Sequence, residues 1–223
     1  MLRRHLMLVP GLALLPTWAR AALNEGDAAS GIRAALTRGA EAAVGSLGRT
    51  DGFMGNPLVR IELPGYLKDA AKLLKMTGQG RRVDELLAAM NHAAEAAVPA
   101  ARPLLVNAVK SMSVEDGLKL LRGGDDAATQ FFASKTRAPL REQFLPIVTR
   151  ATEKVSLADK YNAVAGKAAG MGLLKGDDAN IQQYVTGKAL DGLFLMIAEE
   201  EKKIRKDPVG TGSALLKKVF GGL

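Results

Sequence analysis

Lys188 and Asp191 lie three positions apart at the start of a strongly apolar stretch of the sequence. Residues three apart lie on the same face of a helix, so these two side chains can reach each other. A lysine and a carboxylate enclosed together in a helical bundle can act as general base and general acid. The same pair can instead fix the register of packed helices without any part in a reaction.

Three further polar residues border the apolar face of a helix predicted between residues 83 and 112. At 100° per residue, with the buried stripe set to zero, Asn91 lies at about 40°, Arg102 at about 60° and Glu95 at about 80°. Buried polar groups are normally paired, so the three can form a polar seam at the edge of the core. The alternative is that they line a small ligand pocket.

The use of residue types excludes several kinds of site. Cysteine is absent, which excludes disulfides, thiolate nucleophiles and cysteine-bound zinc. Histidine occurs only at His5 and His92, and no H-E-x-x-H, EF-hand or G-x-S-x-G pattern is present. Basic residues are interspersed with acidic ones and aromatic residues make up 4%, so nucleic-acid binding is not expected. No catalytic residue, metal site or cofactor is predicted.

Residues 1–21 have the pattern of a signal peptide that is removed on export. A pair of arginines precedes a short apolar stretch, and Ala19 and Ala21 fit an A-x-A cleavage site, so the mature chain is expected to begin at Ala22. The apolar stretch is shorter than the ~20 residues of a membrane-spanning helix. We expect a periplasmic protein. The paired arginines leave both the Sec and the twin-arginine routes open.

The mature chain, residues 22–223, is predicted to be a single all-α domain, a bundle of about seven to nine helices. Alanine and leucine are abundant and runs of β-branched residues are scarce, which favours helices. A central helix is expected near 180–206, because its middle is apolar on every side. At most one short extended segment is expected, near 59–63, where apolar and polar residues alternate.

Helix boundaries are predicted from proline, glycine and capping residues. The expected elements are a helix at 27–47, a helix at 66–76, a helix at 83–112 interrupted at Pro99 and Pro103, a short helix to Arg122 capped by Ser113 with Asp116, a helix capped by Asp125 and Asp126, a new helix beginning at Pro139, a helix after Ser156, a helix capped by Asp177 and Asp178 with ion pairs Glu199–Lys203 and Glu201–Arg205 on its exposed end, and an apolar tail helix around 215–220.

Several strings of the sequence together resemble the bacterial exported family named domain of unknown function 4197. The most specific are YVTGKALDGLF at 184–194 and EEEKKIRKDP at 199–208, joined by NHAAE at 91–95, ATQFF at 128–132 and VFG at 219–221. The resemblance covers nearly the whole mature chain. It implies an exported, mostly helical protein, and it implies no activity, cofactor or catalytic residue.

The expected function is that of a non-enzymatic binding or structural module, which holds a partner protein or a small apolar ligand. The alternative is an enzyme that uses Glu95, Asp116, Lys188 or Asp191 as general acid and base groups. Membrane contact is expected to be at most peripheral, through the short basic and amphipathic segment at 215–220.

Overall fold

A computed structural model describes residues 25–153, 156–170, 177 and 180–207 of the chain. The predicted signal peptide at 1–21 and the predicted tail helix at 215–220 lie outside the described residues. The elements are α1 (Glu25–Leu47), α2 (Gly65–Leu74), η1 (Lys75–Gln79), α3 (Gly80–Ala97), η2 (Val98–Ala100), α4 (Ala101–Lys110), α5 (Val114–Arg122), α6 (Ala127–Thr152), α7 (Ser156–Gly170) and α8 (Ile181–Lys206).

The described residues form helices and turns without a β-strand, which confirms the all-α fold class. Along the described residues, no loop separates the elements from α2 to α4, so the helical segments number six, slightly fewer than the expected seven to nine. The chain nevertheless turns between α2 and α3 at Gly78, whose φ is +81°. None of the described helices combines the length and the apolar character that crossing a lipid bilayer requires.

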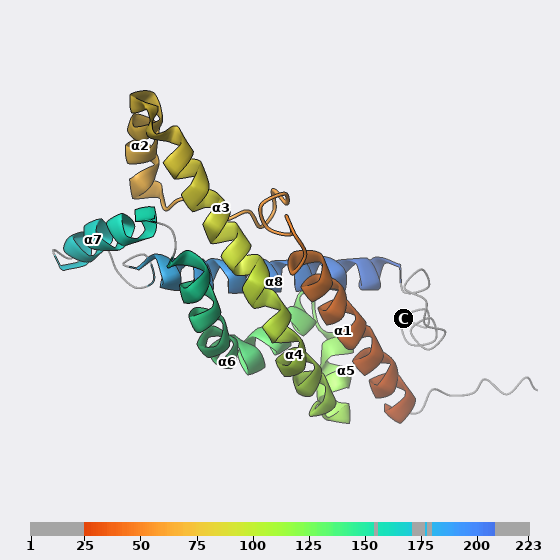
Figure 1. Ribbon diagram of the computed structural model, residues 1–223. Helices are drawn as coiled ribbons and strands as arrows, with labels where there is room; N and C mark the ends of the chain where they lie inside the picture. The colour runs from red at the N-terminus through yellow and green to blue at the C-terminus, as the bar shows by residue number, and fades with distance from the viewer. Residues whose placement is uncertain (1–24, 154–155, 171–176, 178–179, 208–223) are drawn as a thin grey trace, which may run out of the picture.

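Helix α8 forms the centre of the bundle, as predicted for residues 180–206. It packs against α1, α3 and α6, and Figure 1 shows it running across the molecule behind the diagonal formed by α3 and α4. Buried residues occur on most sides of α8, including Val185, Leu190, Leu193 and Phe194. A helix that is apolar on every side can be packed against other helices all round without burying many polar groups. The apolar side chains of α8 therefore contribute much of the hydrophobic core.

The predicted interruption at Pro99 is confirmed, because α3 ends at Ala97 and a 3₁₀ turn leads into α4. A proline has no N–H for the helical hydrogen bond and its ring crowds the preceding turn. Pro103 lies in the first turn of α4, where an N–H is not needed.

The prediction that a new helix begins at Pro139 is wrong, because α6 continues through Pro139 and Pro146. Phe132, Leu140 and Phe144 lie on one buried stripe on both sides of the first proline. Continuous burial on that stripe outweighs the lost hydrogen bond, and the helix bends instead of ending. Figure 1 shows that α6 changes direction along its length.

Two predicted helix caps are also wrong. Asp126 makes no capping bond to the start of α6, and its carboxylate accepts a hydrogen bond from Gln130 instead. The cap of α8 is Asn180, whose side-chain oxygen accepts from the two backbone N–H groups that follow it closely. Asp177 forms an ion pair with Arg141 of α6. Asp126 and Asp177 therefore bind side chains and do not bind the free backbone N–H groups at the start of the helix that follows.

Candidate binding groove

The connection between α1 and α2, residues 48–64, is held against α3 by the buried side chain of Asn91. The Asn91 amide nitrogen donates to the carbonyl oxygens of Ile61 (2.9 Å) and Leu87 (2.8 Å), and its oxygen accepts from the Ile61 N–H (2.8 Å). Asn91 is completely buried. Its amide therefore gives Ile61 the donor and the acceptor that a neighbouring strand would otherwise supply.

Glu95, one turn further along α3, binds the same connection. One of its carboxylate oxygens accepts from the backbone N–H groups of Phe53 (3.0 Å) and Met54 (3.1 Å). Only 6% of Glu95 is exposed, and charge-assisted bonds to backbone N–H groups offset part of the cost of burying it. Asn91 and Glu95 thus bind backbone groups of the connection rather than each other.

Two other residues that the sequence singled out, Arg102 and Asp116, bind elsewhere. Arg102 forms an exposed ion pair with Glu41 of α1 (2.7 Å). Asp116 and Ser113 form the predicted capping box, in which each side chain accepts from the other residue's backbone N–H. Within the described residues, neither has a hydrogen bond or ion pair to Asn91 or Glu95.

The capping box predicts a pH dependence. The Ser113 hydroxyl, and then the Ser113 backbone N–H, donate to Asp116 and hold its pKa below the ordinary value of 3.8. An acid with a lowered folded pKa stabilises the fold above its unfolded pKa, and this is lost as the pH falls through the folded pKa. We expect Asp116→Ala to lower the melting temperature at neutral pH and to lower it progressively less as the pH falls below 3.8. Thermal melts followed by circular dichroism measure the difference in melting temperature between the wild-type protein and the variant. A difference that is equal at neutral and acidic pH would contradict the prediction.

In front of the connection lies a groove of about 440 Å³ between residues 58–65 and α8. The α8 wall is formed by Tyr184, Lys188, Asp191 and Leu195, which are four, three and four positions apart and so share one face of the helix. These residues and Gly192 belong to the predicted central helix. Lys188 and Asp191 are the two that the sequence had singled out as site residues.

The groove has two different ends. The Tyr184 hydroxyl donates to the Glu62 carbonyl (2.8 Å), whereas Gly192 lies against Val59, so the connection runs antiparallel to α8. Leu58 and Leu195, which are 63% and 40% exposed, therefore form an apolar end. The opposite end has Tyr184 and, from α2, the exposed side chain of Lys68.

Lys188 and Asp191 form a charge cluster on the groove wall with a third residue, Arg137 of α6. Asp191 lies 2.7 Å from Arg137 and 3.9 Å from Lys188, whose ammonium group also lies over the Tyr184 ring at 5.7 Å. About half of each charged side chain is open to solvent. The ion pair is thus as predicted, but it is not enclosed, and within the described residues no hydrogen bond or ion pair joins it to Asn91 or Glu95.

This geometry suits binding better than acid–base catalysis. Enzymes usually activate a lysine or carboxylate by removing it from water, and here water reaches the whole cluster. Asp191 is also shared between two cations, which neutralise it. In the described part of the chain, no group of three or more potential metal ligands occurs.

Gly192 allows the connection to approach α8 closely, and this predicts opposite effects for two glycine substitutions. A Cβ at Gly192 would lie 2.7 Å from the ring of the fully buried Phe53, whereas a Cβ at Gly45 of α1 would meet nothing within 4 Å. Overpacking costs about 1–3 kcal/mol and the gain in helix propensity is about 1 kcal/mol. Gly192→Ala should therefore lower the free energy of unfolding by about 1 kcal/mol, and Gly45→Ala should raise it by somewhat less. Urea unfolding measures both, and shifts of the same sign would contradict the close approach.

Comparison with known protein families matches residues 22–221 to a family model described as protein of unknown function (DUF4197). The chain belongs to the DUF4197 family. The match confirms the family resemblance of the sequence strings, and the most specific string, 184–194, forms the α8 wall of the groove in this DUF4197 protein. No curated protein and no solved structure matches the chain.

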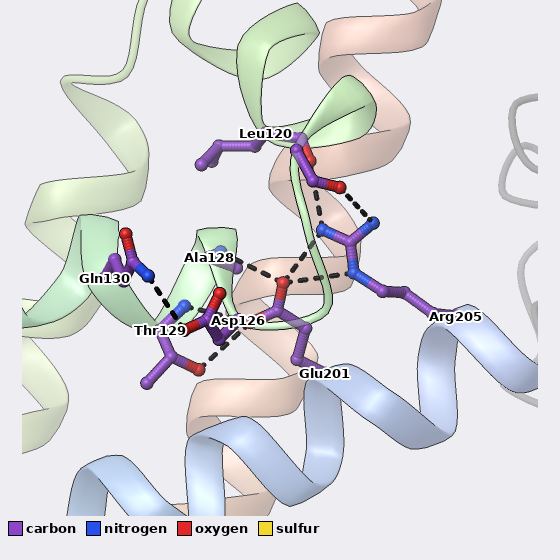
Figure 2. A network of polar contacts seen from close by, with 8 residues as sticks. Leu120, Asp126, Ala128, Thr129, Gln130, Glu201 and Arg205 are labelled. Atoms are coloured by element: carbon purple, nitrogen blue, oxygen red, sulfur yellow. Dashed lines mark hydrogen bonds and ion pairs between the residues drawn. The ribbon is translucent and has the colours of Figure 1, made fainter.

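A second polar cluster of the DUF4197 chain, drawn in Figure 2, joins α8 to the ends of two other helices. The Glu201 carboxylate accepts from the backbone N–H groups of Ala128 (3.0 Å) and Thr129 (2.9 Å) and from the Thr129 hydroxyl (3.0 Å). Arg205 binds the same carboxylate through two of its nitrogens (3.1 and 2.9 Å) and donates to the Leu120 carbonyl (3.0 Å). Glu201 therefore caps the start of α6, and Arg205 caps the end of α5.

The sequence predicted the Glu201–Arg205 pair but not its setting. The two side chains are 6% and 19% exposed, so the expected exposed position is wrong. The predicted pair Glu199–Lys203 is replaced by Glu199–Lys202 and Glu200–Lys203. Local spacing indicates which charges can meet on one helix, whereas the backbone groups of Ala128 and Leu120 come from segments more than 70 positions away.

An apolar cavity of about 40 Å³ lies beside this cluster, between α1, α5, α6 and α8. Ile32, Leu36, Leu121, Phe132 and Ile197 are among its lining residues, which expose almost no polar surface to it. A water molecule needs about 10–15 Å³ in such a cavity, so this one has room for only a few atoms.

Proposed function

We propose that this DUF4197 protein is an exported, non-enzymatic binding module that holds a partner in the groove between residues 58–65 and α8. The observation that carries the proposal is the pair Leu58 and Leu195, two exposed leucines that line one groove next to a solvated charge cluster. Adjacent exposed apolar side chains with a polar rim are typical of interaction sites.

The walls of the groove support the same proposal. Asn91 holds one wall through backbone hydrogen bonds to Ile61, Glu95 holds the same connection further back at Phe53, and the other wall is the central helix of the bundle. A site whose walls are fixed before binding loses less conformational entropy when a partner arrives.

Export is supported by the arginine pair, short apolar stretch and A-x-A site of residues 1–21. The family match begins at residue 22, directly after the proposed cleavage site. Periplasmic fractionation followed by intact-mass measurement tests this. The expected species begins at Ala22, and a cytoplasmic species that retains residues 1–21 would overturn the proposal.

Native mass spectrometry of the mature protein purified from the periplasm tests the binding role. We expect a co-purifying partner that is lost from the double variant Leu58→Asp with Leu195→Asp. The matched control is Leu73→Asp on α2, because Leu73 and Leu58 are equally exposed, at 63% each, and Leu73 does not line the groove. A partner that is retained by the double variant, or the absence of any partner, would overturn the role of the groove.

The carriage of a small apolar ligand is a second candidate function, favoured by the apolar cavity beside Phe132. Its limited volume restricts it to a few carbon atoms or the end of a longer chain. The same native spectra distinguish the two functions, because a ligand in this cavity adds a small mass that the Leu58 and Leu195 substitutions leave in place.

A further inference from the structure

The groove-facing wall of the connection is an exposed backbone edge. Along residues 60–63, which follow a hydrogen-bonded turn at 56–60, burial alternates: Ile61 and Leu63 are buried, whereas Arg60 and Glu62 are exposed, as in an extended chain. The N–H and C=O of one residue in such a chain point to the same side, and those of the next residue point to the opposite side.

The hydrogen bonds of the connection show which backbone groups face α3 and which face the groove. Ile61 directs both of its backbone groups at Asn91, so the backbone groups of Glu62 face away from α3. Tyr184 of α8 donates to the Glu62 carbonyl, which places that side at the groove. The Glu62 N–H has no acceptor among the described residues, and a carbonyl oxygen can accept a second bond. This edge can therefore pair with one residue of a neighbouring strand.

The charge of the groove is unbalanced. Arg60, Lys68 and Lys188 line it and Arg137 is bound to its wall, against two acidic residues, Glu62 and Asp191. Arg60 pairs with Glu62 (3.3 Å), and Lys68 has no ion pair within the described residues.

A second hollow of about 240 Å³ shares Glu62, Leu63 and Lys68 with the groove and is also lined by Lys72 and by Lys75, which forms an ion pair with Asp84 (2.8 Å). Lys68, which lines both hollows, makes the end opposite Leu58 and Leu195 the basic end.

Resting on the proposed binding role, we infer that the occupant of the groove is an extended segment of a partner polypeptide, which pairs its backbone with Glu62. One apolar side chain of the segment lies between Leu58 and Leu195, and acidic side chains lie beside Lys68 and Lys188. Backbone pairing at an exposed edge gives affinity, and the side-chain sites at the two ends give specificity and direction.

Synthetic peptides test this inference on the mature full-length protein. The probes are two fluorescein-labelled eight-residue peptides of alternating threonine and valine, with leucine at one end and two glutamates at the other, in both orders. We expect one order to bind saturably in fluorescence anisotropy and to weaken about tenfold when lysines replace the glutamates or when a backbone amide that pairs with Glu62 is methylated.

A charge reversal supplies the matched variants. Lys68→Glu should weaken binding of the glutamate peptide about tenfold and improve binding of the lysine peptide, whereas Lys110→Glu, at an exposed lysine of α4 outside the groove, should change neither. Equal binding of the methylated peptides would overturn backbone pairing. Failure of both peptide orders to bind, while a partner still co-purifies in a manner that depends on Leu58 and Leu195, would overturn the inference of an extended segment and leave the proposed binding role in place. If both tests fail, the groove is not a binding site.

Discussion

Substitution of Glu201 by alanine is expected to lower the free energy of unfolding by about 3–5 kcal/mol, the range for removal of one partner from a buried ion pair. The substitution leaves the Arg205 guanidinium partly buried without its carboxylate. It also leaves the N–H groups of Ala128 and Thr129 at the start of α6 without their acceptors. The cost therefore combines an unpaired charge with two lost capping bonds.

Urea unfolding followed by circular dichroism measures this loss, and two variants separate its causes. Glu199→Ala removes a carboxylate from an exposed pair with Lys202 on the same helix, and we expect no resolvable change. Glu201→Gln keeps an oxygen for the α6 N–H groups but removes the charge, so its loss should be intermediate. A loss at Glu201→Ala as small as that at Glu199→Ala would contradict the buried pairing.

The fold class was predictable because it depends on local properties of the chain. Alanine and leucine content, the apolar periodicity and the Ser113–Asp116 capping box all act within a few residues. The break at Pro99 was predicted for the same reason. Pro139 was not, because the stripe from Phe132 to Phe144 is buried by other helices, and that burial decides whether a proline bends a helix or ends it.

The candidate site was predictable only in part. The spacing of Lys188 and Asp191 predicts their ion pair, and helical phase placed Asn91 and Glu95 at the edge of the core. The partners of Asn91 and Glu95 are backbone groups of the connection, and no residue type in the sequence encodes such a partner. Arg137 was missed because it reaches Asp191 from 54 positions away.

The strings that carry the family resemblance and lie in the described part of the chain join distant parts of the bundle. Residues 91–95 hold the connection, 184–194 form the opposite wall of the groove, and 128–132 meet 199–208 at the Glu201 cluster. Each of these described strings therefore supplies contacts between elements as well as part of a helix. A binding module with a fixed groove depends on such contacts, because they set the distance between its walls.

The second large effect is expected at Asn91, where the amide must donate and accept at once. Asn91→Ala removes both partners of the buried Ile61 backbone and should lower the free energy of unfolding by about 3 kcal/mol. Asn91→Asp has nearly the same shape, but near neutral pH it directs a negative oxygen at the carbonyls of Ile61 and Leu87. Asn91→Asp should lower the free energy of unfolding at least as much as Asn91→Ala, because a buried charge without a hydrogen-bond donor is costly.

The two substitutions differ in their response to pH, which tests the hydrogen-bond assignment. Burial beside two carbonyls raises the folded pKa of the introduced carboxyl group above its unfolded value of about 3.9. A raised acid pKa destabilises the fold at high pH, and the penalty is relieved as the pH falls from the folded pKa toward the unfolded one. The deficit of Asn91→Asp should therefore shrink between about pH 7 and pH 4, because the protonated group can donate to one carbonyl, while that of Asn91→Ala should stay constant.

Asn107→Asp on the exposed side of α4 is the matched control and should change stability little at either pH. The Asn91 variants also test the link between the fold and the groove, because a connection that is released from α3 no longer fixes the Glu62 edge. Under conditions where Asn91→Ala is still folded, its affinity for the glutamate peptide should fall even though Asn91 does not line the groove. Unchanged affinity would mean that α8 and α2 alone hold the groove open, and that Asn91 contributes stability without shaping the site.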